Sequence, residues 1–387
     1  MTDAGTPTGP VTRSSVTRVG AATAVSALCG YAVLYLAARD LDPAGFSVFG
    51  VFWGAFGLVT GAAFGLLQQS TREIRLAARH DPTAPAPTGI TRPLRLAATV
   101  GMTAAVVVAT TAVLWAPHVF VESRRLSVVL LAVGLACFCL HATLLGMLAG
   151  ADRWSQYGAL MVTDAGIRVV IAVATVTLGW GLEGFLWATV GGSLSWLLLL
   201  LASPATRAAA TLVARESPAS FLRGAAHAVA AAGASAILVM GFPVLLKTTS
   251  GELGAAGGVV ILAVTLTRAP LLVPLTAMQG NLIAHFVDAR AHRLRAVAQA
   301  VAVLAVVGAA GITLAALTGP WLLRVGFGEQ YRASGALLAW LTAGAVVIAV
   351  LTVTGAATVA AALHRAYSLG WVCATVAAAA LLLLPLA

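Results

Sequence analysis

Eleven stretches of this chain are long and apolar enough to cross a lipid bilayer, and they leave little sequence for anything else. They cover residues 19–38, 46–67, 94–115, 126–149, 157–180, 184–202, 224–246, 254–283, 296–317, 335–363 and 369–387. A membrane-spanning helix needs about twenty apolar residues, and these runs lack the alternation of a lipid-facing β-strand. Only 9% of the 387 residues are charged, against about 25% in soluble domains. The sequence therefore predicts an all-α integral membrane protein with about eleven spans.

The loops between these spans carry unequal numbers of basic residues. With a cytoplasmic N-terminus, fifteen basic residues fall in inside segments and six in outside segments. Cytoplasmic loops are enriched in Lys and Arg, so we expect the N-terminus to be cytoplasmic and the chain to be a multi-pass protein of the plasma membrane. This bias also accounts for the net charge of +10 without a nucleic-acid partner.

The spans divide into two groups. We expect a disordered cytoplasmic tail at residues 1–15, a lobe of six spans at 16–202, a cytoplasmic linker at 203–223 and a lobe of five spans at 224–387. Residues 36–74 and residues 245–286 each contain the same features in the same order: a helix, a short Gly-containing turn with an acidic residue, and a long Gly-rich helix. An offset of about 209 residues pairs Gly45 with Gly254. Repeated halves of this kind are typical of two-lobed transporters.

Arg268 is the candidate site residue that the sequence singles out. It is the only charged residue in the run 254–283, and fourteen residues of helix before it place it about 21 Å from the start, near mid-membrane. Such a charge costs at least about 2.5–3.5 kcal/mol. Pro270 and Pro274 follow it, which predicts a helix broken towards a cavity. Arg268 is then either a ligand for a diphosphate or the partner of an acid such as Asp164 or Glu183.

Two other groups could contribute to a central cavity. Asp164 and Arg168 are four residues apart in the fifth span, the favourable order for an ion pair on one helix face; Arg168 is otherwise a second anion ligand. Near the cytoplasmic ends of the second and eighth spans, amides could bind sugar hydroxyls or join helices to each other. These are Gln68, Gln69, Gln279 and Asn281.

The same sequence offers no catalytic or cofactor motif. The only lysine, Lys247, does not lie in a Gly-rich phosphate loop, and no paired acids of the kind that hold magnesium occur in a cytoplasmic loop. We therefore expect neither an enzyme nor a cofactor.

Short motifs in both halves resemble a known transporter family. Residues 39–75 begin RDLDPAGFSVFG and end LLQQSTREIR, and GFGEQYRASGALLAWL occupies 326–341. The first segment resembles the opening hairpin of bacterial polysaccharide flippases, in the multidrug, oligosaccharidyl-lipid and polysaccharide exporter superfamily; the second resembles a later outside turn of that family. The matching positions of the first motif are Arg39, Leu41, Asp42, Pro43, Gly45, Phe49 and Gly50.

This resemblance implies a two-lobed flippase for a lipid-linked anionic saccharide of the undecaprenyl-diphosphate type, with membrane lipids and glycosyltransferases or a polymerase of the same pathway as partners. The family usually has twelve or fourteen spans, whereas eleven are counted here. The alternatives are a drug/cation antiporter of the same superfamily, a membrane-embedded glycosyl- or prenyl-transferase, and a non-transporting scaffold for glycan synthesis.

Overall fold

The computed structural model describes residues 13–78, 89–277, 292–361 and 363–383, together with Leu282, His285, Phe286 and Ala289. The first half contains α1 (Arg13–Asp40), α2 (Pro43–Ala78), α3 (Pro93–Val119), α4 (Arg124–Gly150), α5 (Trp154–Leu178), α6 (Gly181–Gly191), the short 3₁₀ helix η1 (Gly192–Leu194) and α7 (Ser195–Ala202). The second contains α8 (Pro204–Ala210), α9 (Pro218–Met240), α10 (Phe242–Ser250), α11 (Gly254–Ala277), α13 (Arg293–Phe327), α14 (Gly335–Ala360) and α15 (His364–Leu383).

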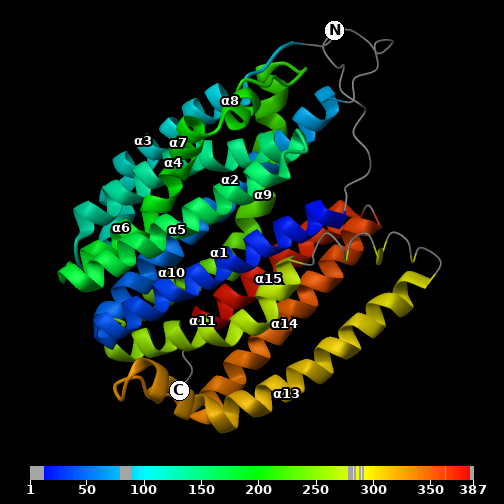
Figure 1. Cartoon of the computed structure of the whole chain (residues 1–387). Helices are drawn as coiled ribbons and strands as arrows, with labels where there is room; N and C mark the ends of the chain where they lie inside the picture. Colours follow the sequence, from blue (N-terminus) through cyan, green and yellow to red (C-terminus); the bar gives the residue numbers. More distant parts are fainter. Residues whose placement is uncertain are drawn as a thin grey trace.

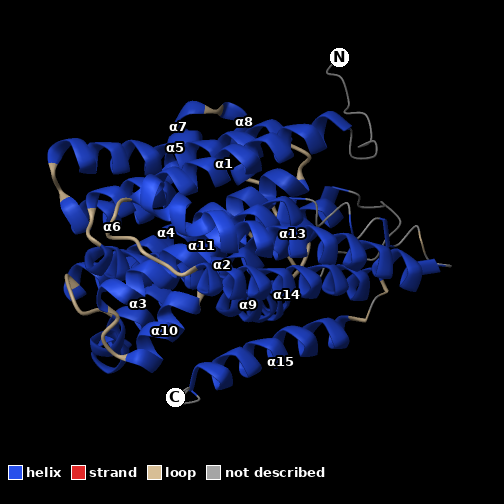
Figure 2. Cartoon of the chain, turned by 90° about the horizontal axis from the view of Figure 1, so that it is seen from below, coloured by secondary structure: helices blue, strands red, loops and turns tan. Residues whose placement is uncertain are grey.

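Within the described residues, ten helices are long and apolar enough to cross a membrane, counting α6 to α7 as one. The eleventh predicted span corresponds to α15, whose apolar core is the shorter segment Leu369–Ala378. Helices joined by loops make up the described chain, and no strand is drawn in it (Figure 2). The all-α membrane architecture predicted from the sequence is confirmed.

Helix α2 makes the main contact of the first half with the second. It packs against α4 within its own half and against α9 and α11 of the second half. The blue-to-green helices gather apart from α13 and α14 (Figure 1). Glycines make these close approaches possible. A Cβ at Gly65 would collide with the backbone of Ala228 and Val229 in α9, and one at Gly146 in α4 would collide with the backbone of α2.

Several predicted spans differ from the observed helices. Helix α2 continues eleven residues beyond the predicted end of the second span, and α13 continues ten residues beyond the predicted end of the ninth. The sixth is divided by η1, where Gly191 and Gly192 lie close to the side chains of α5. The seventh ends at Met240, six residues earlier than predicted, and α10 follows it as a separate helix with Pro243 in its first turn. The predicted break in the eighth span is wrong, because α11 continues through Pro270 and Pro274 to Ala277.

Two connections on the predicted cytoplasmic side are joined to each other. Thr91, just before α3, and Ala214, just before α9, exchange backbone hydrogen bonds of 3.0 and 2.9 Å, and the Thr91 hydroxyl donates to the Glu216 carbonyl at 2.7 Å. The segment predicted as a linker therefore contains α8 and this bridge. At the N-terminus, α1 begins at Arg13, so the last three residues of the predicted tail belong to this helix.

Candidate functional site: a cavity between the halves

Two adjoining cavities follow the contact between the halves. One, of about 350 Å³, is lined by α1, α2, α9, α10 and α11. The other, of about 420 Å³, is lined by α2, α9, α11, α14 and α15. Val239, Met240 and Leu272 line both. Together they form a central cavity at the position where a two-lobed transporter would hold its cargo.

Arg268 lines the first of these cavities. One guanidinium nitrogen donates a hydrogen bond of 3.0 Å to the backbone carbonyl of Val239, and the guanidinium carbon lies 5.5 Å from the centre of the Phe242 ring. Among the described residues, no acid lies within ion-pair distance of Arg268. Arginine has five N–H donors, so this fixed cation has donors left for a ligand.

A proline explains why Val239 accepts this bond. The residue four positions after Val239 is Pro243, which has no N–H to complete the helical bond to the Val239 carbonyl. The sequence analysis considered only Pro270 and Pro274, on the helix of Arg268 itself, and gave no role to Pro243. The acids expected as structural partners are engaged elsewhere: Asp164 pairs with Arg168, and Glu183 accepts from Ser123 at 2.9 Å.

Apart from Thr265, the remaining walls of this cavity are aromatic and aliphatic. Tyr31 comes from α1, Trp53 from α2 and Phe242 from α10, and none of the described residues that line it is acidic. Such a site favours a ligand with one anionic group and extensive apolar or sugar surface, because rings provide broad contact area. Sequence reasoning missed these three aromatic residues, since their apolar runs look like any other span.

The ion pair expected between Asp164 and Arg168 is present. Two guanidinium nitrogens of Arg168 each lie 3.1 Å from an Asp164 carboxylate oxygen, and a third donates to the Thr189 carbonyl at 2.6 Å. The guanidinium also lies 5.7 Å from the centre of the Phe56 ring. Neither residue lines the central cavity, and the partners of Arg168 named above all belong to the first half, which favours a structural role for the pair.

Of the four side-chain amides predicted to line the cavity, the two that the structure describes lie in different surroundings. Gln68 lines the second cavity, but Gln69 is buried between the halves, where its amide nitrogen lies 3.4 Å from Glu73 and 3.3 Å from Glu216. Gln69 therefore joins α2 to the segment before α9. The pattern Gln69-x-x-x-Glu73 on one helix face was a signal for this cluster that the sequence analysis did not use. Gln279 and Asn281 lie outside the described residues.

The two motifs that carry the family resemblance meet at the predicted outer side. The Asp42 carboxylate accepts a 2.7 Å bond from the Gly45 backbone and so caps α2. Tyr331, completely buried, packs edge-on against Phe46 with 6.2 Å between ring centres. Burial and the nearby Asp42 carboxylate raise the pKa of Tyr331, so its hydroxyl stays neutral. These turns bring the two halves together above the cavity.

This arrangement of helices is that of a known class of membrane protein. The chain superimposes on the inward-facing conformation of a multidrug resistance MATE family transporter of the MOP superfamily, with a TM-score of 0.63 and 17% identity over 92% of this chain and 83% of that one. A MATE structure in complex with MaD5 gives a TM-score of 0.62 and 18% identity, covering 94% of this chain and 85% of that one. The fold is therefore the MATE fold.

At the level of sequence the chain has much nearer relatives. It is 67% identical over 378 residues to the uncharacterized protein Mb3654 of Mycobacterium bovis, covering 98% of this chain and 87% of the relative. It is 63% identical over 395 residues to the uncharacterized protein Rv1510 of Mycobacterium tuberculosis, covering 100% of this chain and 89% of the relative. No protein-family model matches. The chain belongs to the family of these mycobacterial proteins, and it is a multi-pass integral protein of the plasma membrane.

Proposed function

We propose that this protein is a transporter that flips a lipid-linked anionic saccharide across the plasma membrane by alternating access. The single observation that carries the proposal is Arg268, a cation inside the cavity between the halves with no acidic partner among the described residues. Diphosphate oxygens accept forked, charge-assisted bonds from arginine. The surrounding Tyr31 and Trp53 rings offer the flat surfaces on which a sugar can rest.

Two further observations support it. Residues 39–75 resemble the first hairpin of polysaccharide flippases. The MATE transporters that share the fold have been solved in inward-facing and outward-facing conformations, which is the pair of states that alternating access requires. In the proposed cycle the diphosphate binds at Arg268 while the lipid tail stays in the bilayer.

A drug/cation antiporter is the second candidate, because the solved neighbours are described as multidrug transporters. The positive charge of the cavity argues against an antiporter for cationic drugs. A cationic drug would meet Arg268 and no compensating acid among the described lining residues, and the deep acid Asp164 is already neutralised by Arg168. Like charges at close range cost several kcal/mol, so we expect the cavity to reject such substrates.

Reconstitution of the purified chain in liposomes separates these functions. The probe is a polyprenyl-diphosphate disaccharide carrying a fluorophore that external dithionite bleaches; a second set of vesicles receives ethidium. We expect the protein to make nearly all of the lipid probe accessible to dithionite and to leave ethidium distribution unchanged. Ethidium transport without movement of the lipid probe would establish the antiporter instead. Movement of neither probe would favour a non-transporting scaffold and contradict the proposal.

Locking the contact between the halves should stop transport. Ala62 in α2 and Gly233 in α9 face each other, with 3.5 Å between the Ala62 Cβ and a Cβ built at Gly233, a spacing that a disulfide accepts. In a background without the four native cysteines, the Ala62→Cys/Gly233→Cys pair should cross-link on oxidation and reduce probe flipping to the level of empty vesicles. Chemical reduction of the disulfide should restore probe flipping. Full transport by the cross-linked protein would contradict alternating access by separation of α2 and α9; each single cysteine variant is the control.

A further inference from the structure

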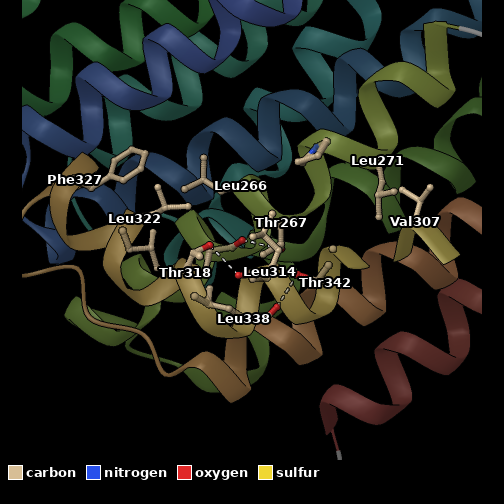
Figure 3. A pocket seen from close by; sticks show the side chains of 16 residues that line it. Leu266, Thr267, Leu271, Val307, Leu314, Thr318, Leu322, Phe327, Leu338 and Thr342 are labelled. Carbon is tan, nitrogen blue, oxygen red and sulfur yellow. Dashed lines mark hydrogen bonds between the residues drawn. The ribbon is translucent and has the colours of Figure 1, made fainter. Parts of the chain in front are cut away.

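A third cavity lies in the second half, on the opposite face of α11 from Arg268. It has a volume of about 480 Å³ and is bounded by α11, α13 and α14 (Figure 3). Both α11 and α13 pack against α14, so α14 forms the base and the other two helices form the walls. Leu266, Thr267 and Leu271 face this cavity, whereas Thr265, Arg268 and Leu272 face the central one.

The lining offers a ligand no free side-chain hydrogen-bond donor. Among the described residues that line the cavity none is charged, and the only polar side chains are three threonines. Each threonine hydroxyl donates to a carbonyl of its own helix, as the dashed lines in Figure 3 show: Thr267 to Ala263 at 2.8 Å, Thr318 to Leu314 at 2.9 Å and Thr342 to Leu338 at 2.7 Å. A water molecule or a sugar would lose hydrogen bonds on entering. The chemistry of the walls therefore selects hydrocarbon.

The cavity also lies beside the lipid-facing surface. Three of its lining residues on α13 are largely exposed: Val307 at 51%, Leu314 at 61% and Leu322 at 53%. In a membrane, the medium that reaches these side chains is the bilayer interior. An apolar space of this size left empty would forfeit dispersion contacts on every wall, and apolar cavities readily bind apolar molecules.

We propose that the cavity between α11, α13 and α14 binds a single hydrocarbon chain of a membrane lipid. The chain enters past the exposed side chains of α13 and lies against Leu266, Leu271 and Leu338, while the lipid headgroup stays outside the cavity. This site is separate from the central cavity and does not depend on the proposed transport. Its ligand is either the acyl chain of a bilayer phospholipid or the isoprenoid chain of a carrier lipid, which share this chemistry.

Photo-cross-linking tests the site. The full chain is reconstituted with a phospholipid that carries a diazirine in one acyl chain or, in a parallel sample, with a polyprenyl phosphate that carries a diazirine in its tail. Cross-linked residues are mapped by peptide mass spectrometry. We expect labels on the α11, α13 and α14 residues that line the cavity, at several times the yield on exposed α3 residues. The probe that labels identifies the lipid, and labelling by either supports the proposal; equal yields over cavity and α3 would overturn it.

Filling the cavity gives the second measurement. A Cβ at Gly311 meets only the Thr342 methyl group, at 3.8 Å, so a large side chain there can extend into the cavity. Gly311→Trp should lower cavity labelling at least five-fold. Gly344→Trp is the matched control, because Gly344 is exposed on α14 with nothing within 4 Å of its Cβ. If Gly311→Trp does not fold, Ala315→Phe fills the same space. If a cavity-filling variant folds and its cavity is labelled as strongly as that of the unmodified protein, the site is refuted. Arg268→Met, which alters only the central cavity, should leave the labelling of this cavity unchanged.

Discussion

Arg268→Met should abolish flipping of the diphosphate-linked probe while leaving the protein folded in the membrane. The substitution keeps an unbranched side chain but removes every N–H donor. If the guanidinium gives a diphosphate two hydrogen bonds, each worth about 1.5–3 kcal/mol because it is charge-assisted, the loss is about 100-fold or more in apparent affinity. The measurement is initial flipping rate against probe concentration, normalised to the amount of folded protein.

Stability should change much less than transport in this variant. The Val239 carbonyl loses its donor, which costs about 1–3 kcal/mol, but a desolvated cation is removed at the same time. Arg268→Lys should give an intermediate rate, since an ammonium keeps the charge without the fork. Arg324→Met, at the predicted outer end of α13, is the control and should transport normally. A purely structural Arg268 would produce the reverse pattern: a less stable protein with an unchanged rate per folded molecule.

Asp164→Asn should have the largest effect on stability. The side chains of Asp164 and Arg168 are only 18% and 14% exposed, and removal of one partner leaves a buried, uncompensated charge. Breaking such a pair typically costs about 3–5 kcal/mol, a large fraction of the stability of an average domain. We expect a strongly reduced yield and a thermal unfolding transition that is lower by many degrees in detergent.

The double variant Asp164→Leu/Arg168→Met decides whether the two residues act as a unit. Replacing both charges together by apolar groups is often close to neutral, so the double variant should be more stable than Asp164→Asn. Destabilisation equal to the sum of the single changes would contradict this account. A folded double variant that flips the probe at the normal rate would assign the pair to structure, and one that folds without flipping would restore Arg168 as an anion ligand.

The class of fold and the position of most helices could be predicted from the sequence, because a bilayer imposes a length and an apolar composition on each span. The same rule misplaced the end of α9, and the two prolines of α11 led to a predicted break that the structure does not show. Hydropathy does not distinguish residues 241–246 from the helix before them, although Pro243 separates α10 from α9. Proline inside α11 is tolerated, because neighbouring groups can replace the lost bond.

The candidate site was only partly readable. Arg268 was conspicuous as a lone charge in a long apolar run, and Asp164–Arg168 as a pair at helical spacing. For Gln69 the sequence left two roles open, a ligand for sugar hydroxyls or a contact between helices, and the structure shows the contact, with Gln69 buried against Glu73 and Glu216. The sequence could not identify Tyr31, Trp53 and Phe242 as cavity-lining residues. An aromatic residue that faces a cavity has the same local sequence pattern as one that faces lipid.

By itself, the sequence determined that the chain is a bundle of membrane helices with one isolated cation near mid-depth, because burial of charge in hydrocarbon is costly wherever the helix lies. Only the tertiary structure decided what that cation meets. Whether Arg268 faces an acid, lipid or a cavity depends on how α9, α10 and α11 pack, and the partner that it found is a backbone carbonyl left free by Pro243 on another helix. Contacts between segments distant in sequence arise from packing, which local composition does not encode.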